Sequence, residues 1–311
     1  MTLSKEDLAL RRTGITASDV VILAGEGRYG KTAHDVYASK VFDNYAFGPM
    51  TEAQRLGHKL EPIIVAEVAE RDSLAIEYPR PTIKSAKHPI AIATLDGCIL
   101  DGLLPGTYLG ESYEQLNIES KRVGALEIKV VGNQMLKDWA DEKVPDYVQL
   151  QVQWQLLVSD MRKAIVAALM GTEIKTFPIT YDEEIGGALL EIAERFWMDH
   201  VLKRAAPEID GSDGAERYIK ARWPRHERPM LQADNEIEQL AQEIFALKGR
   251  RDAAEADVAL AQQRMMDIVK DAEGIQGDGW RLIYRLGNES YVAAHMRKAS
   301  RKFDLRRVGK K

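Results

Sequence analysis

The stretch Gly124-Ala125-Leu126-Glu127-Ile128-Lys129-Val130-Val131 decides the fold predicted for this chain. Side chains alternate along a strand, so Glu127 and Lys129 share one face and the aliphatic residues between them take the other. We therefore expect a buried strand that carries a carboxylate beside an ammonium group. Taken alone, such a triplet is more often a solvent-facing Glu/Lys pair than a catalytic one.

A second carboxylate follows the apolar segment Ile90–Leu95, where Asp96 stands directly before Gly97. This pattern predicts a strand near residues 90 to 100 that delivers Asp96 at a turn. With Glu61 upstream, three carboxylates are available, and carboxylates are the hard oxygen ligands that Mg²⁺ binds beside water and phosphate oxygens. Such an ion polarises a phosphodiester and activates water, while a lysine offsets the developing negative charge.

Five short motifs occur in a fixed order between roughly residues 10 and 205. They are RRTGITASD (Arg11 to Asp19), GHKLEP (Gly57 to Pro62), Leu95-Asp96-Gly97, LEIK (Leu126 to Lys129) and LQVQ (Leu150 to Gln153). Together they resemble the PD-(D/E)xK nucleases of the lambda-exonuclease and YqaJ-like viral recombinase family. The resemblance implies an α/β core with a mixed central sheet flanked by helices.

The resemblance also implies roles for individual positions. Mg²⁺ or Mn²⁺ would be held by three carboxylates, those of Glu61, Asp96 and Glu127. The other implied catalytic positions are Lys129 and Gln151. The positions implied to receive the 5′-phosphate of DNA are Arg11 and Ser18, with Arg12 as a second arginine able to clamp the anion.

The segment around Ser18 has a second, independent interpretation. Thr16 or Ser18 predicts a helix N-cap, and a helix N-terminus attracts anions. The same residues are also explained by a helix N-cap that binds no ligand.

Two features depart from the family pattern. Leu95 stands where the family has proline, and about 30 residues separate Asp96 from Glu127. We expect the segment Leu103 to Val123 to form an inserted hairpin or loop.

The implied activity is that of a DNA exonuclease, 5′ to 3′ on duplex ends, which leaves 3′ overhangs for a single-strand annealing protein in phage-type recombination. The resemblance further implies a homo-oligomer, with the ring of three of lambda exonuclease as the precedent. An endonuclease of the same core and a non-catalytic DNA-binding scaffold are the alternatives.

A competing motif lies at Gly25 to Thr32, where GEGRYGKT fits the P-loop pattern and Lys31 would be its lysine. A P-loop ATPase is therefore a further alternative. That pattern requires a strand immediately before the loop and a sustained helix after it. The cap residues before Gly25 favour a helix there instead.

Composition limits the class of protein. The chain has 311 residues, 45% hydrophobic content and a single cysteine, Cys98, so an intrachain disulfide is impossible. Because no apolar run approaches the ~20 residues of a membrane span and the N-terminus is charged, we expect a cytoplasmic protein of a bacterial or phage-infected cell. The net charge is −5, but residues 281–311 carry ten Lys/Arg against two Asp/Glu, which suggests DNA contact or simply solubility.

Three parts are expected along the chain: a nuclease domain at 1–208, a linker at 209–230 and a helical, basic module at 231–311. The last contains an apolar seam with alternating spacings of three and four residues, as in a coiled coil. Its members are Ile237, Leu240, Ile244, Leu247, Arg251, Ala254, Val258, Ala261, Met265 and Ile268. One long helix is predicted, pairing with another subunit or folding back on the nuclease domain, followed by strands at 280–286 and 301–308.

Overall fold

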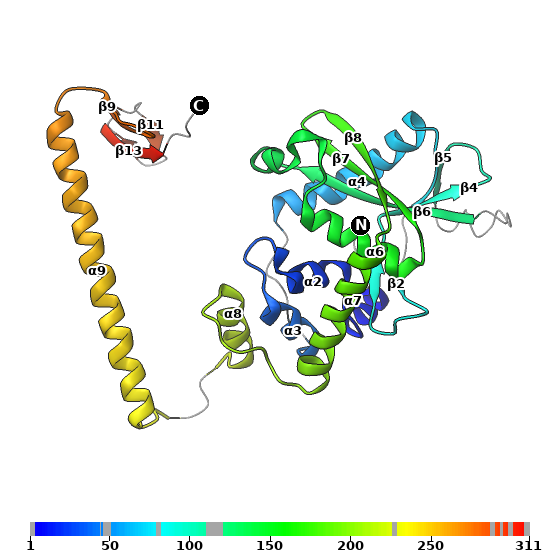
Figure 1. Cartoon of the computed structure of the whole chain (residues 1–311), viewed down its shortest axis with the longest axis horizontal. Coiled ribbons are helices and arrows are strands. Elements are labelled where there is room, and N and C mark those ends of the chain that lie inside the picture. The colour runs from blue at the N-terminus through cyan, green and yellow to red at the C-terminus, as the bar shows by residue number, and fades with distance from the viewer. Residues whose placement is uncertain are drawn as a thin grey trace. The chain divides into compact units, whose positions relative to one another are not determined.

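The computed structural model describes residues 4–43, 45, 51–78, 82–109, 121–225, 229–286, 290–292, 295–297 and 301–307. The chain divides into two compact units, Met1–His226 and Glu227–Lys311. The first is the mixed α/β unit that the sequence predicts (Figure 1). Within the described residues, no helix combines the length and the apolar character needed to span a membrane.

The first unit has the following elements. Its helices are α1 (Lys5–Arg12), α2 (Ala17–Val21), η1 (Ile22–Glu26), α3 (Ala33–Val41), α4 (Glu52–Arg71), η2 (Asn133–Glu142), α6 (Asp146–Ser159), α7 (Glu183–Phe196), η3 (Trp197–Leu202) and α8 (Asp213–Arg222). Its strands are β1 (Ala75–Tyr78), β2 (Thr82–Lys84), β3 (Ile92–Thr94), β4 (Gly97–Asp101), β5 (Gly106–Leu109), β6 (Lys121–Val131), β7 (Lys163–Met170) and β8 (Glu173–Thr180).

A six-stranded mixed sheet in the order β5-β1-β4-β6-β7-β8 forms the centre of the unit. Strand β6 pairs antiparallel with β4 and parallel with β7. A parallel pair needs a crossover connection, and η2 with α6 supplies it between β6 and β7. Strand β6 was expected at this position.

The two faces of the sheet pack against different helices. Leu126 and Ile128 of β6 join an apolar cluster with α4, through residues such as Val65 and Val68. The other face packs against α6, and α2 and α7 pack on α6 in the same larger apolar cluster. The alternation predicted for β6 is therefore confirmed, and it turns Glu127 toward α6.

The strand expected near residues 90 to 100 is interrupted at its centre. Strand β3 pairs with β2 in a separate two-stranded sheet, whereas β4 belongs to the central sheet. Asp96 lies at the bend between them, so Gly97 begins a strand instead of ending one. A Cβ atom at Gly97 would lie 3.2 Å from the carbonyl oxygen of Glu77, which explains why glycine occupies this close approach to β1.

The segment expected to form an inserted hairpin is partly a strand. Residues 106–109 form β5, which pairs parallel with β1 at the edge of the central sheet. Residues 110–120 lie outside the described part of the chain.

The first unit extends to residue 226, beyond the boundary expected at residue 208. Helix α8 falls inside the expected linker, yet it packs on α3. Arg217 of α8 donates to both carboxylate oxygens of Asp35 at 2.8 and 2.7 Å, and Tyr45 donates to the same carboxylate at 2.6 Å. Tyr218 is buried beside α3, so the middle part of the expected linker packs on the first unit.

The Arg217–Asp35 pair should contribute measurably to stability. Asp35 is fully buried, and Arg217→Leu would leave its charge without its guanidinium partner. Because Arg217 is partly exposed, we expect a loss of about 2–3 kcal/mol in the free energy of unfolding, below the range for a fully buried pair. Urea denaturation measures it. Lys220→Met, which breaks an exposed pair on the same helix, is the control and should leave the midpoint unchanged.

The second unit consists of the long helix α9 (Asn235–Val269) and short strands. These strands are β9 (Gly274–Gln276), β10 (Trp280–Leu286), β11 (Ser290–Val292), β12 (His295–Arg297) and β13 (Arg301–Arg307). Strands β13, β10 and β9 form one antiparallel sheet, and β11 pairs with β12. The single uninterrupted helix and the two strands at 280–286 and 301–307 agree with the sequence-based prediction.

Candidate active site

Glu127 is the centre of a dense polar network. Its side chain is almost fully buried, and Lys129 from the same strand contacts its Oε1 atom. From α6, Gln151 Nε2 donates to Glu127 Oε1 at 2.7 Å, and Gln155 Nε2 donates to Oε2 at 2.6 Å. Lys129 also donates to Gln151 Oε1 at 3.0 Å. Strand β6 and helix α6 thus fix this carboxylate from both sides.

Asp96 reaches the same place from the bend between β3 and β4. Its Oδ2 atom accepts a hydrogen bond of 2.7 Å from the backbone N–H of Ile128. Burial raises the pKa of Asp96 well above its ordinary value, and the negative charges of Glu127 and Glu61 raise it further. Burial would lower the pKa of Lys129, but the charges of Glu127 and Asp96 outweigh it and raise that pKa.

Glu61 is presented from α4, as expected. One turn earlier on the helix, the Nδ1 atom of His58 lies 3.6 Å from Glu61 Oε2. Burial, with the charges of Glu61 and Asp96, raises the pKa of Tyr78 to about 12.

An open cavity of about 650 Å³ joins these groups. It is lined by all five sequence-predicted catalytic and metal positions, namely Glu61, Asp96, Glu127, Lys129 and Gln151. Tyr29 and Lys31 from the loop after η1 and Arg217 from α8 also line it. Cationic side chains therefore border a cavity whose base is acidic, an arrangement suited to a phosphate chain held over a cation.

The donor set fits a hard divalent cation. Three carboxylates converge on the cavity without a cysteine among its lining residues, which is the chemistry that Mg²⁺ and Mn²⁺ prefer. However, among the described residues no three His, Cys, Asp or Glu side chains form a ready-made metal site. At Glu127, Lys129 and Gln151 contact Oε1 and Gln155 contacts Oε2. A cation bound by Glu127 would compete with these contacts.

A smaller cavity of about 200 Å³ contains two of the predicted phosphate positions. Arg11 and Ser18 line it together with Asp96. Arg11 donates to Thr94 Oγ1 at 3.0 Å and lies 3.5 Å from Ser18 Oγ. Arg12 instead points to the surface, where it pairs with Asp43 at 2.9 Å. The structure thus brings Arg11 and Ser18 to the site and leaves Arg12 outside it.

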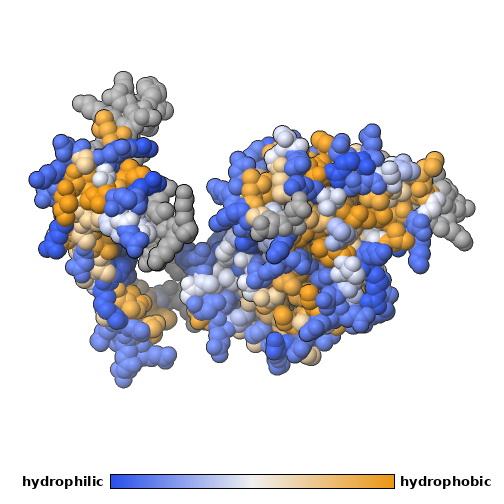
Figure 2. Space-filling model, turned by 45° about the horizontal axis from the view of Figure 1, so that its top comes forward, coloured by the Kyte–Doolittle hydropathy of each residue, from blue (hydrophilic) through white to orange (hydrophobic). Residues whose placement is uncertain are grey.

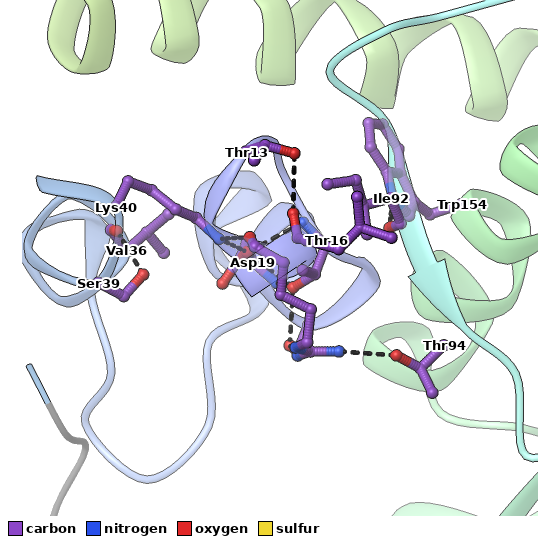
Figure 3. Close-up of polar contacts among 12 residues, drawn as sticks. Thr13, Thr16, Asp19, Val36, Ser39, Lys40, Ile92, Thr94 and Trp154 are labelled. Carbon is purple, nitrogen blue, oxygen red and sulfur yellow. Dashed lines mark hydrogen bonds and ion pairs between the residues drawn. The ribbon is translucent and has the colours of Figure 1, made fainter. Parts of the chain in front are cut away.

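Contacts with residues 90–91 and with Lys40 hold the segment that carries Arg11 and Ser18. Ile15 forms a parallel bridge with Ala91, and a Cβ atom at Gly14 would lie 2.2 Å from the carbonyl oxygen of Ile90. Lys40 from α3 donates to Asp19 at 2.7 Å and to the carbonyl oxygen of Arg11 at 2.9 Å (Figure 3).

The cap of α2 belongs to the same arrangement. Thr16 is the N-cap, and its backbone N–H donates a hydrogen bond of 2.9 Å to the Asp19 carboxylate. The capping role proposed for Thr16 is thus confirmed, while Ser18 lies one position inside the helix.

Two residues of the site were missed by the sequence analysis. Gln155 is fully buried and bonds Glu127, and its spacing of one helical turn from Gln151 on α6 was the available signal. His58 stands three residues before Glu61 on α4 and lines both cavities. Its place in the GHKLEP motif was the available signal.

The P-loop interpretation is not supported by this geometry. Helices α2 and η1 precede Gly27–Thr32, whereas a phosphate-binding P-loop follows directly on a strand. Lys31 borders the acidic cavity instead.

Comparison with known proteins identifies the first unit. The YqaJ-like viral recombinase domain matches residues 8–162, a range that contains every site residue discussed above except Arg217. The chain belongs to this family.

The relatives of this YqaJ-like chain agree with that assignment. It is 27% identical over 274 residues to the uncharacterized protein YqaJ of Bacillus subtilis strain 168, covering 86% of this chain and 79% of that protein. Its fold is similar to the crystal structure of the alkaline exonuclease LHK-Exo of Laribacter hongkongensis in complex with dAMP. That match has a TM-score of 0.50 and 14% identity, and covers 70% of this chain and 97% of the exonuclease.

Proposed function

We propose that this YqaJ-like protein is a metal-dependent DNA exonuclease that digests one strand of a duplex from its end, 5′ to 3′. The observation that carries the proposal is the convergence of Glu61, Asp96, Glu127 and Lys129 on one cavity. Membership of the viral recombinase family supports DNA as the substrate. The alkaline exonuclease with a similar fold supports cleavage from ends.

The residues divide the proposed chemistry among them. Asp96 and Glu127 would hold Mg²⁺ or Mn²⁺, with Glu61 assisting, and the ion would polarise the scissile phosphate and activate water. Gln151 and Gln155 orient the Glu127 carboxylate. Lys129 places a positive charge beside it, where it stabilises negative charge that develops on the phosphate oxygens.

A direct assay separates this function from its alternatives. The protein is incubated with linear and closed circular duplex DNA, each with Mg²⁺, Mn²⁺ or EDTA, and with or without ATP. We expect the linear DNA to be shortened, the circle to be spared and EDTA to stop the reaction. Nicking of the circle would identify an endonuclease of the same core. Retention of DNA without cutting would identify a binding scaffold. A requirement for ATP would support the P-loop ATPase alternative.

Arg11 is proposed to recognise the terminal 5′-phosphate. Arg11→Gln removes the guanidinium from the smaller cavity, so we expect digestion of 5′-phosphorylated ends to slow by about 10- to 100-fold, toward the rate on 5′-hydroxyl ends. Rates on the two kinds of end, measured with the same duplex, test this. Arg12→Gln is the matched control, because Arg12 pairs with Asp43 outside the cavity. Equal slowing on both ends would contradict phosphate recognition.

The remaining expectations concern the partners and the place of action. The 3′ overhangs would serve a single-strand annealing protein in recombination, within the cytoplasm of a bacterial or phage-infected cell. Co-purification with such a protein and protection of the overhang test the first point. Association into a homo-oligomer, for which the family resemblance suggests a ring of three, is tested by the mass of the chain in solution.

A further inference from the structure

Helix α9 has an apolar seam that the other described elements of the second unit leave largely exposed. The helix contains 35 residues, and Val269 at its last position is its one buried residue. Ile237, Leu240, Ile244 and Leu247 are each 45–58% exposed. Apolar surface is visible between the charged residues along this helix in Figure 2. Helices in proteins draw most of their stability from packing such a face, so we expect α9 to pack its seam against a partner.

The composition of the seam specifies the number of helices that cover it. In heptad notation, the a positions hold Ile237, Ile244, Arg251, Val258 and Met265, and the d positions hold Leu240, Leu247, Ala254, Ala261 and Ile268. β-branched residues at a with leucine at d favour two parallel strands over three or four. We propose that α9 pairs with α9 of a second copy of this chain, as a parallel, in-register, two-stranded coiled coil.

The charges beside the seam support the parallel orientation and its register. In a parallel pair, each g residue faces the e residue that follows in the next heptad of the partner. Glu243 then faces Lys248, and Arg250 faces Glu255, each pair occurring twice by symmetry. All four contacts join opposite charges.

Slipping the two helices by one heptad loses this complementarity. Because the two chains are identical, a slip in either direction gives the same arrangement. It brings Arg250 against Lys248, Asp257 against Glu255 and Glu243 against Glu255, all like-charged, and makes one attractive contact, Glu236 with Lys248. Only the unshifted parallel register places all ten seam residues of one helix against those of the other. It also has no like-charged g–e contact.

Arg251 is the single polar residue in the seam, at an a position. Its guanidinium already turns outward to Asp252, at 2.6 and 2.9 Å, and lies 3.7 Å from Glu255. The aliphatic part of the side chain remains available to the seam. A single polar residue at an a position lowers the stability of a coiled coil, but it fixes the register and the number of strands.

The consequence is an assembly of two chains. The pairing joins two copies at the same end of α9, where the segment 227–234 connects each to its own first unit. This arrangement favours two nuclease units per assembly over the ring of three. The proposed pairing is argued from the second unit alone, so it does not depend on the proposed function.

Mass measurement of the full-length protein by light scattering tests the pairing. We expect twice the mass of one chain. Lys248→Glu converts two attractive contacts into repulsive ones and should weaken the dimer by about tenfold. Glu243→Lys combined with Lys248→Glu exchanges the charges and should restore the affinity. A single-chain mass, a trimer, or a double variant no better than Lys248→Glu would each overturn the proposal.

Cysteine crosslinking tests orientation and register. Leu240→Cys lies in the seam near one end of α9, so a parallel pair brings the two new thiols together. Mild oxidation should then give a crosslinked dimer on a non-reducing gel, while buried Cys98 stays out of reach. Gln242→Cys, on the opposite face two residues away, is the matched control and should not crosslink. A dimer in solution that fails to crosslink at position 240 would be antiparallel, which would overturn the proposed orientation.

Discussion

Glu127→Gln should reduce metal-dependent DNA degradation by about a thousandfold, because a neutral amide replaces the carboxylate proposed to hold the cation. The fold should survive the change. The buried Oε1 atom of Gln155 has no hydrogen-bond partner, so it can accept a bond from the new amide if the two side chains reorient. Initial rates on end-labelled linear duplex measure the effect, and thermal unfolding confirms that the variant is folded.

A control on another strand separates this effect from general damage. Glu173→Gln removes an exposed carboxylate at the start of β8, which is not among the residues that line the acidic cavity. We expect it to keep full activity. If a clean preparation of Glu127→Gln degraded DNA as fast as Glu173→Gln does, the proposed metal centre would be wrong.

Lys40→Met should destabilise the first unit by about 3–5 kcal/mol, because it leaves the charge of Asp19 buried without its partner. The side chains of Lys40 and Asp19 are only 4% and 7% exposed. Lys40 also holds the carbonyl oxygen of Arg11, so the variant should loosen the segment that carries the proposed phosphate residue. Urea denaturation at pH 7 measures the free energy of unfolding. Lys87→Met, which breaks an exposed pair with Asp160, is the matched control and should have little effect.

The pH dependence of this loss has a definite sign. Burial would raise the pKa of Asp19, but Lys40 and the Thr16 hydrogen bonds outweigh it and hold the pKa below its ordinary value of 3.8. A lowered folded-state pKa stabilises the fold above the ordinary value, and this contribution disappears as the pH falls through the folded-state pKa. The difference between the wild type and Lys40→Met should therefore be largest near neutral pH and shrink in acid. A difference that stayed constant down to pH 3 would show that the pair is not its source.

Local periodicity in the sequence determined much of this protein. The period of two placed Glu127 and Lys129 on one face of β6, and the seam of threes and fours predicted a single α9 through Gly249. Both patterns depend on near neighbours in the chain, so no long-range contact is needed to read them. The order of the short motifs carried the family assignment for the same reason.

Only the tertiary structure decided how distant residues meet. The bend at Asp96 arises because β3 and β4 join different sheets, and a run of apolar residues does not reveal which partners its two halves will pair with. The segment that forms helix α8 was assigned to the linker. The residue that anchors it, the buried Asp35, lies 182 residues from Arg217 along the chain, so the local sequence does not reveal this contact. Side-chain type fixes what a residue can bond. Which bond forms depends on the packing of elements far apart in the sequence, and that packing alone brought Arg11 to the cavity and left Arg12 at the surface.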